Sequence, residues 1–141
     1  LAQCDIVAAR MRRKKKKCTS VSITFRTLDF RNRSHQTKLP NATDITDEIY
    51  RCAKQLFRES WKGEPLRLIG VSVTGLTEDD FEQLSLFEDP EKKEKSRKLD
   101  AALDAIRQKY GNDKVTRASI LNGTQGIARK AKAQMKNDAE N

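Results

Sequence analysis

The hydrophobic positions along the chain change their spacing several times, and each change predicts a new element. Residues 1–17 carry apolar side chains three and four residues apart, which is typical of a helix, and they end in a basic run. Residues 18–30 alternate between apolar and polar side chains and are rich in β-branched residues, so they predict a half-buried strand. Residues 31–39 predict a polar returning strand, which Pro40 should end because proline donates no ladder hydrogen bond.

The clearest helix is predicted over residues 43–61. Thr43, Asp44 and Thr46 are its candidate N-terminal caps, because free amide groups and the helix dipole favour an oxygen there. Its predicted apolar stripe consists of Ile45, Ile49, Cys52, Ala53, Leu56 and Phe57.

Residues 66–76 alternate again and predict a second strong strand. Gly70 lies within it, which indicates either a bulge or a place where another molecule approaches the backbone closely. The order over residues 1–76 is therefore helix, strand, strand, helix, strand. Two helices can cover one face of the sheet, which predicts an α+β sandwich whose other face carries hydroxyl and basic side chains. A face of this kind is suited to contact phosphate groups.

The rest of the chain divides into three parts. Residues 77–95 are acidic and predict a flexible linker. Residues 96–121 predict a helix over residues 96–110, followed by a short strand over residues 114–121. The apolar positions of that helix are Leu99, Ala102, Leu103, Ile106 and Tyr110. Residues 122–141 are small, polar and lysine-rich, so we expect them to be disordered.

The net charge of +9 at pH 7 is unevenly placed. Residues 1–38 hold eleven basic and two acidic residues, whereas residues 78–91 hold seven acidic residues and no basic one. A basic block attracts polyanions by Coulomb steering and counterion release, which favours nucleic acid as a partner. A solvated basic face without a partner is the alternative explanation.

The remaining composition excludes several classes of protein. Cys4, Cys18 and Cys52 lie at no metal-ligand spacing and indicate a reducing cytosol, so we expect a cytoplasmic protein. His35, the single histidine, has no second ligand near it in sequence. No apolar run is long enough to span a membrane, so we expect no membrane partner. A free-standing enzyme has little support, because the chain lacks a glycine-rich phosphate loop. The chain begins at Leu1 inside a predicted helix, so we expect it to be a fragment.

A short apolar motif lies within the acidic segment. It resembles the peptide that binds the bacterial β sliding clamp, and it consists of Gln83, Leu84, Ser85, Leu86 and Phe87. In this interpretation Leu86 and Phe87 fill an apolar pocket, Leu84 rests beside it, and Gln83 forms a hydrogen bond at its rim. Burial of two such anchors, less the ordering of the linker, gives an affinity on the order of micromolar. The alternative is a short strand or helical turn that packs back on its own domain.

Residues 5–76 resemble the little-finger domain of Y-family DNA polymerases of the UmuC/DinB type, also called ImpB/MucB/SamB. The resemblance rests on the segments VAARMRRKKKK, CTSVSITFRTLDFRNRSHQTKLP, TDITDEIYRCAKQLFRESW and PLRLIGVSVTGL, with QLSLF following the last of them. It implies a β-α-β-β-α-β sandwich with its first strand missing, with an antiparallel sheet and helices on one face, plus a C-terminal helical tail. If the missing strand is central, strand 66–76 loses its main neighbour and exposes a hydrophobic edge.

The resemblance implies the DNA-binding and clamp-tethering C-terminal part of an error-prone translesion DNA polymerase, which acts in DNA repair and the SOS response. The open sheet face would hold the phosphate backbones of damaged primer-template DNA without reading its bases. The implied DNA-binding residues are Thr24, Arg26, Arg31, Arg33, Ser34, Lys38, Arg67 and Ser72. Arg67 matches a phosphate-contacting arginine of the family, and Ser72 stands where some members have a basic residue. The basic run 12–17 could contact the DNA backbone or other polymerase domains, or could be a solvated helix end.

The resemblance assigns no catalytic residue to this chain, because the palm, fingers and thumb are absent. Mg²⁺ would belong to the palm of the parent protein, so we expect no cofactor in this chain. The remaining polymerase domains are expected partners, together with DNA and the clamp.

A small basic RNA-binding or ribosome-associated protein is the competing hypothesis. The charge and the α+β pattern would allow it. It would not explain the QLSLF motif, and the predicted sheet face lacks the paired aromatic residues that stack RNA bases.

Overall fold

The structure is a computed structural model of the 141-residue chain, and it describes residues 1–78, 89–111, 115 and 117. A three-stranded antiparallel sheet with the strand order β2-β1-β3 forms its centre. The strands are β1 (Cys18–Thr27), β2 (Asn32–Thr43) and β3 (Leu66–Thr74). The three strands predicted within residues 1–76 are thus present, and β1 is the central one.

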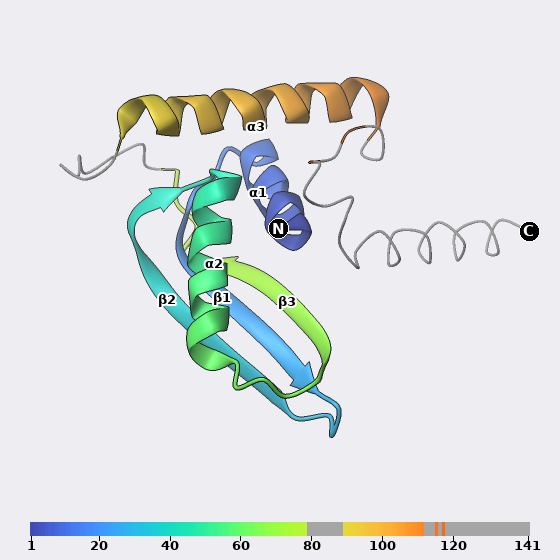
Figure 1. Cartoon of the computed structure of the whole chain (residues 1–141). Helices are drawn as coiled ribbons and strands as arrows, with labels where there is room; N and C mark the ends of the chain where they lie inside the picture. The colour runs from blue at the N-terminus through green and yellow to red at the C-terminus, as the bar shows by residue number, and fades with distance from the viewer. Residues whose placement is uncertain (79–88, 112–114, 116, 118–141) are drawn as a thin grey trace, which may run out of the picture.

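Three helices pack around this sheet, namely α1 (Ala2–Arg13), α2 (Thr46–Ser60) and α3 (Pro90–Tyr110). Figure 1 shows α1 and α2 on one face of the sheet, while α3 crosses the end of the sandwich beside them. This arrangement confirms the predicted α+β fold with an antiparallel sheet, helices on one face and a further helix after them.

The core lies between the sheet and the first two helices. Val21, Ile23 and Phe25 of β1 alternate toward the helices and are at most 1% exposed. The stripes that cover them consist of Cys4, Ala8 and Met11 of α1 and of Ile49, Ala53 and Leu56 of α2. The period-two and helical patterns in the sequence therefore identified the core correctly.

The strand register decides between the two explanations of Gly70. Thr24 of the central strand pairs with Ser34 of β2 on one side and with Gly70 of β3 on the other. The register shift between β1 and β3 lies between Arg26 and Thr27, so Gly70 is not at a bulge. A Cβ atom at Gly70 would lie 3.9 Å from the carbonyl oxygen of Thr24, which is an ordinary contact distance. The absent side chain therefore leaves a low point on the exposed face of the sheet.

Pro40 does not end the second strand. β2 continues to Thr43, and its register against β1 shifts between the pairs Ser20–Lys38 and Cys18–Thr43. The shift leaves three extra residues in β2, and β2 is an edge strand, so a residue without a donor is accommodated there. The prediction treated proline as a terminator because it did not identify the strand as an edge.

The N-terminus of α2 obtains its hydrogen-bond acceptors from an unexpected source. Ile45 occupies the cap position and its own side chain supplies no hydrogen bond. The Ile45 amide donates to Thr43 Oγ1 at 3.1 Å, and the Thr46 amide donates to Asp100 Oδ2 at 3.0 Å. Of the three predicted caps, Thr43 accepts a hydrogen bond from the residue just before the helix. The first residue of the helix, Thr46, donates instead to Asp100, which belongs to α3.

The third helix begins earlier than predicted. Pro90 is its first residue, and Asp89 caps it by accepting a hydrogen bond from the Glu91 amide at 3.0 Å. Residues 77–95 were predicted as a linker, and the last part of that segment, residues 90–95, is therefore helical. The motif 83–87 and the tail 122–141 lie outside the described residues, as does most of the strand predicted over residues 114–121.

The predicted loss of the main neighbour of β3 is wrong. β3 pairs with β1 along its length, from Leu66 opposite Thr27 to Thr74 opposite Ser20. Among the described residues, no strand pairs with the other edge of β3. No helix in the described part of the chain combines the length and the apolar character needed to cross a bilayer.

Candidate nucleic-acid interface

The sheet face opposite α1 and α2 carries a row of hydroxyl groups that ends in a guanidinium group. Ser22, Thr24 and Arg26 project from this face of β1, because their neighbours in sequence point into the core. Ser34 Oγ lies 3.3 Å from Ser22 Oγ and accepts a hydrogen bond from Thr24 Oγ1 at 3.4 Å. Arg26 Nε donates to Asn32 Oδ1 at 2.8 Å, which fixes the guanidinium group along the sheet.

The two outer strands extend the same face. Lys38 of β2 is exposed and pairs with Ser20, while Ser72 of β3 is exposed and pairs with Ser22. Within the described residues, no helix lies over this surface (Figure 1). We call it the open face, and the predicted DNA-binding residues on it are Thr24, Arg26, Ser34, Lys38 and Ser72. Ser22, Asn32 and Gln36 also lie on this face, and strand parity could have added them to the predicted DNA-binding residues.

Arg33 does not lie on the open face. It pairs with Phe25, whose ring is fully buried under the helices, and paired residues share one face of a sheet. Arg33 Nη1 lies 3.5 Å from Glu64 Oε1, in the loop that follows α2. Its grouping with the open-face residues was wrong, because Arg33 and Arg31 were placed without the register of the hairpin.

Arg31 and Arg67 lie at the hairpin end of the sheet. Arg31 Nε forms an exposed ion pair with Asp29 Oδ2 at 3.0 Å. A hydrogen bond from Thr27 lowers the pKa of Asp29, and the charge of Arg31 lowers it further. The guanidinium carbon of Arg67 lies 4.5 Å from the centre of the Phe30 ring, next to the register shift between β1 and β3. Both arginines are exposed, and they lie beyond the edge of the open face.

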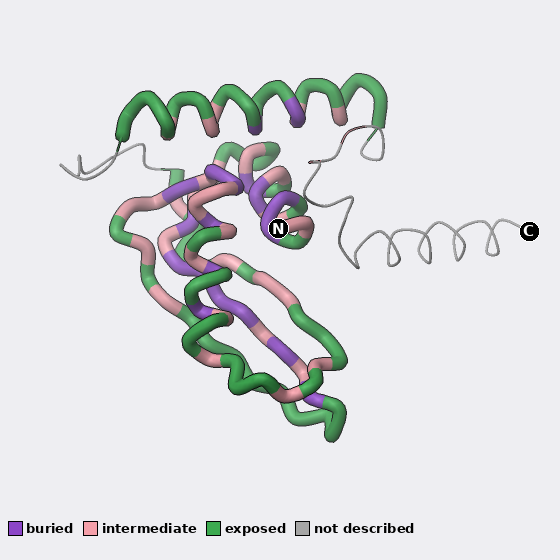
Figure 2. Tube along the Cα trace, in the orientation of Figure 1, coloured by how far each residue is buried: buried purple, intermediate pink, exposed green. Residues whose placement is uncertain are grey.

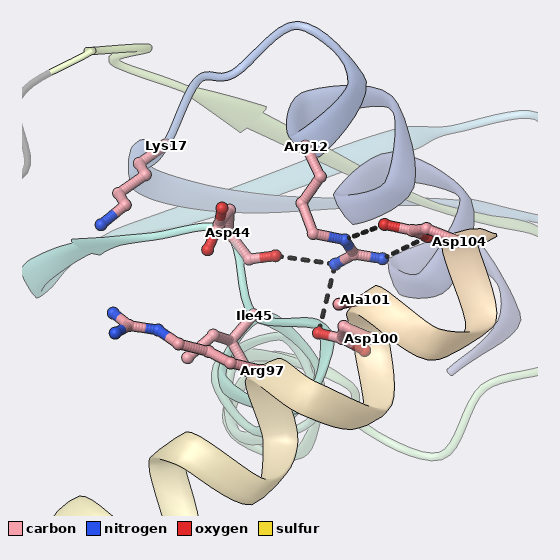
Figure 3. Close-up of a pocket in the computed structure, with 8 residues that line it drawn as sticks. All are labelled: Arg12, Lys17, Asp44, Ile45, Arg97, Asp100, Ala101 and Asp104. Atoms are coloured by element: carbon pink, nitrogen blue, oxygen red, sulfur yellow. Dashed lines mark hydrogen bonds and ion pairs between the residues drawn. The ribbon is translucent and has the colours of Figure 1, made fainter.

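The basic run at the end of α1 does not act as one surface. Arg12 is mostly buried: Nε donates to Asp104 Oδ2 at 2.6 Å, and Nη1 donates to the Asp44 carbonyl at 2.8 Å and to Asp100 Oδ2 at 3.2 Å (Figure 3). Burial alone would lower the pKa of Arg12, but the hydrogen bond to Asp104 and the surrounding carboxylates raise it above its ordinary value. Arg12 is therefore a structural residue, while Lys16 forms an exposed ion pair with Glu78 at 3.4 Å.

Asp100 is the centre of the junction between α3 and the rest of the domain. This side chain is 1% exposed, and it accepts hydrogen bonds from Arg12 Nη1, from Arg117 Nη2 at 2.9 Å and from the Thr46 amide. Arg117 Nη1 also contacts Asp47 Oδ1 at 2.6 Å. A further buried pair joins Arg107 Nη2 of α3 to Asp5 Oδ2 of α1 at 2.6 Å. Charged groups from both ends of the sequence thus hold α3 in place, and the sequence analysis did not predict this junction.

The described residues do not suggest a metal centre. No group of three or more histidine, cysteine, aspartate or glutamate side chains in the described part is arranged to hold a metal ion. His35 stacks on Phe25 with a distance of 5.9 Å between ring centres. Cys18 is fully buried, and burial raises the pKa of its thiol to about 12.

The sequence relationships agree with this geometry. The sequence model of the impB/mucB/samB family C-terminal domain matches residues 1–86, which include the whole sheet and both covering helices. The chain belongs to this family. The impB/mucB/samB domain is the C-terminal domain of Y-family polymerases, so the resemblance found in the sequence is confirmed.

Several curated relatives of this impB/mucB/samB domain are named as DNA polymerases. DNA polymerase IV of Clostridium acetobutylicum is 42% identical over 118 residues, which are 84% of this chain and 30% of the relative. DNA polymerase IV of Pelotomaculum thermopropionicum is 36% identical over 122 residues, or 86% of this chain and 30% of the relative. DNA polymerase IV 2 of Bacillus subtilis is 34% identical over 117 residues, or 80% of this chain and 28% of the relative. The chain therefore spans less than a third of the length of these relatives.

The similarity also includes α3. A match of 118 residues in this chain is longer than the 86 residues of the family match, so it continues past residue 86. Even a match that began at Leu1 would extend beyond Tyr110, the last residue of α3. The helix that docks through Asp100 is thus part of the region that this chain shares with a DNA polymerase IV.

Proposed function

We propose that this chain is the DNA-holding and clamp-tethering C-terminal part of an error-prone translesion DNA polymerase that acts in DNA damage tolerance. The observation that carries the proposal is the open face: a narrow sheet with hydroxyl and basic side chains, uncovered by any described helix. Family membership and the names of the relatives support DNA as the partner. The nucleotidyl transfer itself, with its Mg²⁺, would be the work of a palm domain outside this chain, and that domain and its neighbours would be further partners.

The dimensions of the open face suit the major groove of DNA. Three strands span about 10 Å at the usual strand spacing, and the major groove is about 12 Å wide. Arg26 and Lys38 supply charge near opposite ends of the face, and the hydroxyl groups between them can donate to phosphate oxygens. The low point at Gly70 lets a phosphate or sugar approach the sheet backbone. Contacts of this kind hold the duplex without selecting its sequence, which suits a polymerase that passes varied lesions.

Salt dependence tests this DNA contact, and the hairpin offers a matched pair of variants. Fluorescence anisotropy with labelled primer-template DNA would give the affinity of the full chain at several salt concentrations. Arg26→Gln removes a cation from the open face, so the slope of log affinity against log salt should fall by about 0.9. Arg33→Gln removes the same charge from the other face and should leave that slope unchanged. Equal effects of the two variants, or tighter binding to structured RNA than to duplex DNA, would refute the open face as a DNA site.

The clamp-tethering part of the proposal rests on the motif 83–87. In the sequence, its apolar residues Leu84, Leu86 and Phe87 are flanked by acidic residues and follow the last strand of the sheet. A docking peptide is accessible to a partner when it lies outside the folded domain in this way. Leu86→Ala together with Phe87→Ala should remove the binding of purified bacterial β sliding clamp, measured by surface plasmon resonance, and should leave DNA binding unchanged. Clamp binding that survives this double substitution would show that the motif is not the tether.

A further inference from the structure

The third helix presents its apolar residues to solvent. It docks on the domain mainly through polar side chains, since Asp100 and Arg107 form buried ion pairs there and Leu103 is its one buried apolar residue. Figure 2 shows its buried and half-buried residues on the side facing α1 and α2, with exposed residues on the other side. The exposed apolar positions form a stripe at helical spacing, and they are Leu99, Ala102, Ile106 and Tyr110. Leu99, Ile106 and Tyr110 are 46%, 38% and 60% exposed.

A helix on the surface of a domain usually turns its apolar stripe toward the core. An apolar stripe that faces solvent therefore indicates a site where another molecule binds. Lys92, Lys95 and Lys98 are exposed on the part of α3 that leads up to Leu99, together with Glu91 and Glu94, so this part carries a small excess of positive charge. A parallel pair of two copies of this chain would bring these lysines together, which disfavours that arrangement. DNA would match the lysines but would leave the apolar stripe without a hydrophobic contact. The combination fits a protein surface with an apolar groove and carboxylates at its edge.

The order of the sequence places this stripe beside the clamp-binding motif. Two residues separate Phe87 from Pro90, so the first residue of α3 lies within about 10 Å of Phe87. Leu99 follows Pro90 by nine helical residues, or about 14 Å along the axis. Any protein that seats Phe87 therefore has the start of α3 at its surface, and the stripe continues away from that point.

We propose that the outer stripe of α3 is a second contact surface for the sliding clamp, adjacent to the pocket that takes residues 83–87. This inference rests on the proposed clamp tethering. The apolar residues of the stripe occupy a shallow groove on the clamp, and the lysines pair with carboxylates at its margin. The ion pairs of the Asp100 junction keep α3 fixed to the sheet domain, so the stripe loses little conformational freedom on binding.

A double substitution on the stripe tests the second contact. Leu99→Ala combined with Ile106→Ala removes the apolar surface while keeping good helix formers, so α3 should remain helical and docked. With purified β sliding clamp as the probe, surface plasmon resonance should show an affinity about tenfold lower than for the unchanged chain. Gln108→Ala, also an exposed position on α3 but outside the stripe, should leave the affinity unchanged. Lys95→Glu with Lys98→Glu should lower the affinity and weaken its dependence on salt.

The outcomes separate this inference from the proposal beneath it. Loss of clamp binding in the variant with Leu86→Ala and Phe87→Ala, with no change in the stripe variants, would overturn the second contact and leave the tether intact. A full chain that does not bind the clamp at all would overturn the tether itself. If the stripe variants instead lose affinity for DNA, or abolish a concentration-dependent dimer in sedimentation velocity, the stripe serves another partner and the inference fails.

Discussion

Replacing Asp100 by alanine should release α3 from the domain. In the structure, Asp100 accepts hydrogen bonds from Arg12, Arg117 and the Thr46 amide. Without the Asp100 carboxylate, Arg12 would keep Asp104 and the Asp44 carbonyl as acceptors. The Thr46 amide and Arg117 Nη2 would each lose the Asp100 oxygen that accepts from them. Each buried donor without an acceptor costs about 1–3 kcal/mol, and breaking a buried ion pair from one side costs about 3–5 kcal/mol. We therefore expect the docking of α3 to weaken by about 3–5 kcal/mol.

Amide hydrogen exchange measures this loss where it occurs. Most of the stability of a helix in a protein comes from tertiary packing, so the α3 amides should lose protection by roughly a hundredfold or more in the Asp100→Ala variant. The amides of β1 should lose less, because the sheet core does not depend on α3. Asp100→Asn keeps an acceptor oxygen but loses the charge. It should therefore weaken the docking of α3 less than Asp100→Ala does, by about 1–2 kcal/mol.

A neighbouring carboxylate provides the control. Glu94 is exposed on α3, so Glu94→Gln removes one negative charge from the helix without changing the junction. The free energy of opening of the α3 amides, obtained from their exchange rates, should change by less than about 0.5 kcal/mol. If Asp100→Ala and Glu94→Gln behave alike in α3, the ion pairs do not hold the helix and the reasoning is refuted.

Three further predictions follow from local geometry. Gly70→Gln should weaken primer-template binding about tenfold in the anisotropy assay while the urea midpoint stays nearly constant, because the new side chain covers the low point on the open face. Gly75→Ala should destabilise the fold by about 1–3 kcal/mol in urea unfolding, since a Cβ would stand 1.9 Å from the Thr19 hydroxyl, whereas Gly63→Ala, with no atom within 4 Å, should cost less than that. At pH 9 the Cys18 thiol, with its pKa raised to about 12 by burial, should be roughly 0.1% ionised and should resist iodoacetamide until urea unfolds the chain, as mass spectrometry would show. The same raised pKa means that stability is lost as pH rises from about 9 toward 12, because the unfolded thiol releases its proton first.

The sheet and its two covering helices could be predicted from the sequence because their periods are unambiguous. Val21, Ile23 and Phe25 alternate with polar residues, and the structure buries all three. The errors occur where a position depends on its neighbours in space. Pro40 is tolerated because β2 is an edge strand whose register against β1 shifts there, and neither property is visible in the local pattern. Arg33 was grouped with the open-face residues because the register of the hairpin, which pairs it with Phe25, was unknown.

The junction of α3 was missed for a different reason. A sequence pattern identifies the apolar side of a helix and assumes that this side faces the core. In α3 the predicted apolar positions other than Leu103 face outward, and the contact with the domain is made mainly by Asp100, Asp104 and Arg107. Their partners in α1, Arg12 and Asp5, are separated from them by 88 to 102 residues in sequence, so no local pattern connects them. The one local sign of a polar docking side was the spacing of Asp100 and Asp104, which places both carboxylates on the same face of the helix.

The two proposed surfaces are compatible with simultaneous use. The open face is on the side of the sheet away from α1 and α2, while α3 crosses the end of the sandwich (Figure 1). A chain held by residues 83–87 and the α3 stripe on a clamp that encircles DNA would present its open face to the duplex at an effective concentration in the millimolar range. A weak, salt-sensitive DNA contact would then suffice, and release of the clamp contact alone would free the chain from the template. Affinity for primer-template DNA that carries a loaded clamp should therefore exceed affinity for bare DNA by about a hundredfold or more, and alanine at Leu86 and Phe87 should remove this gain. Equal affinity for the two templates would show that the surfaces cannot be engaged together.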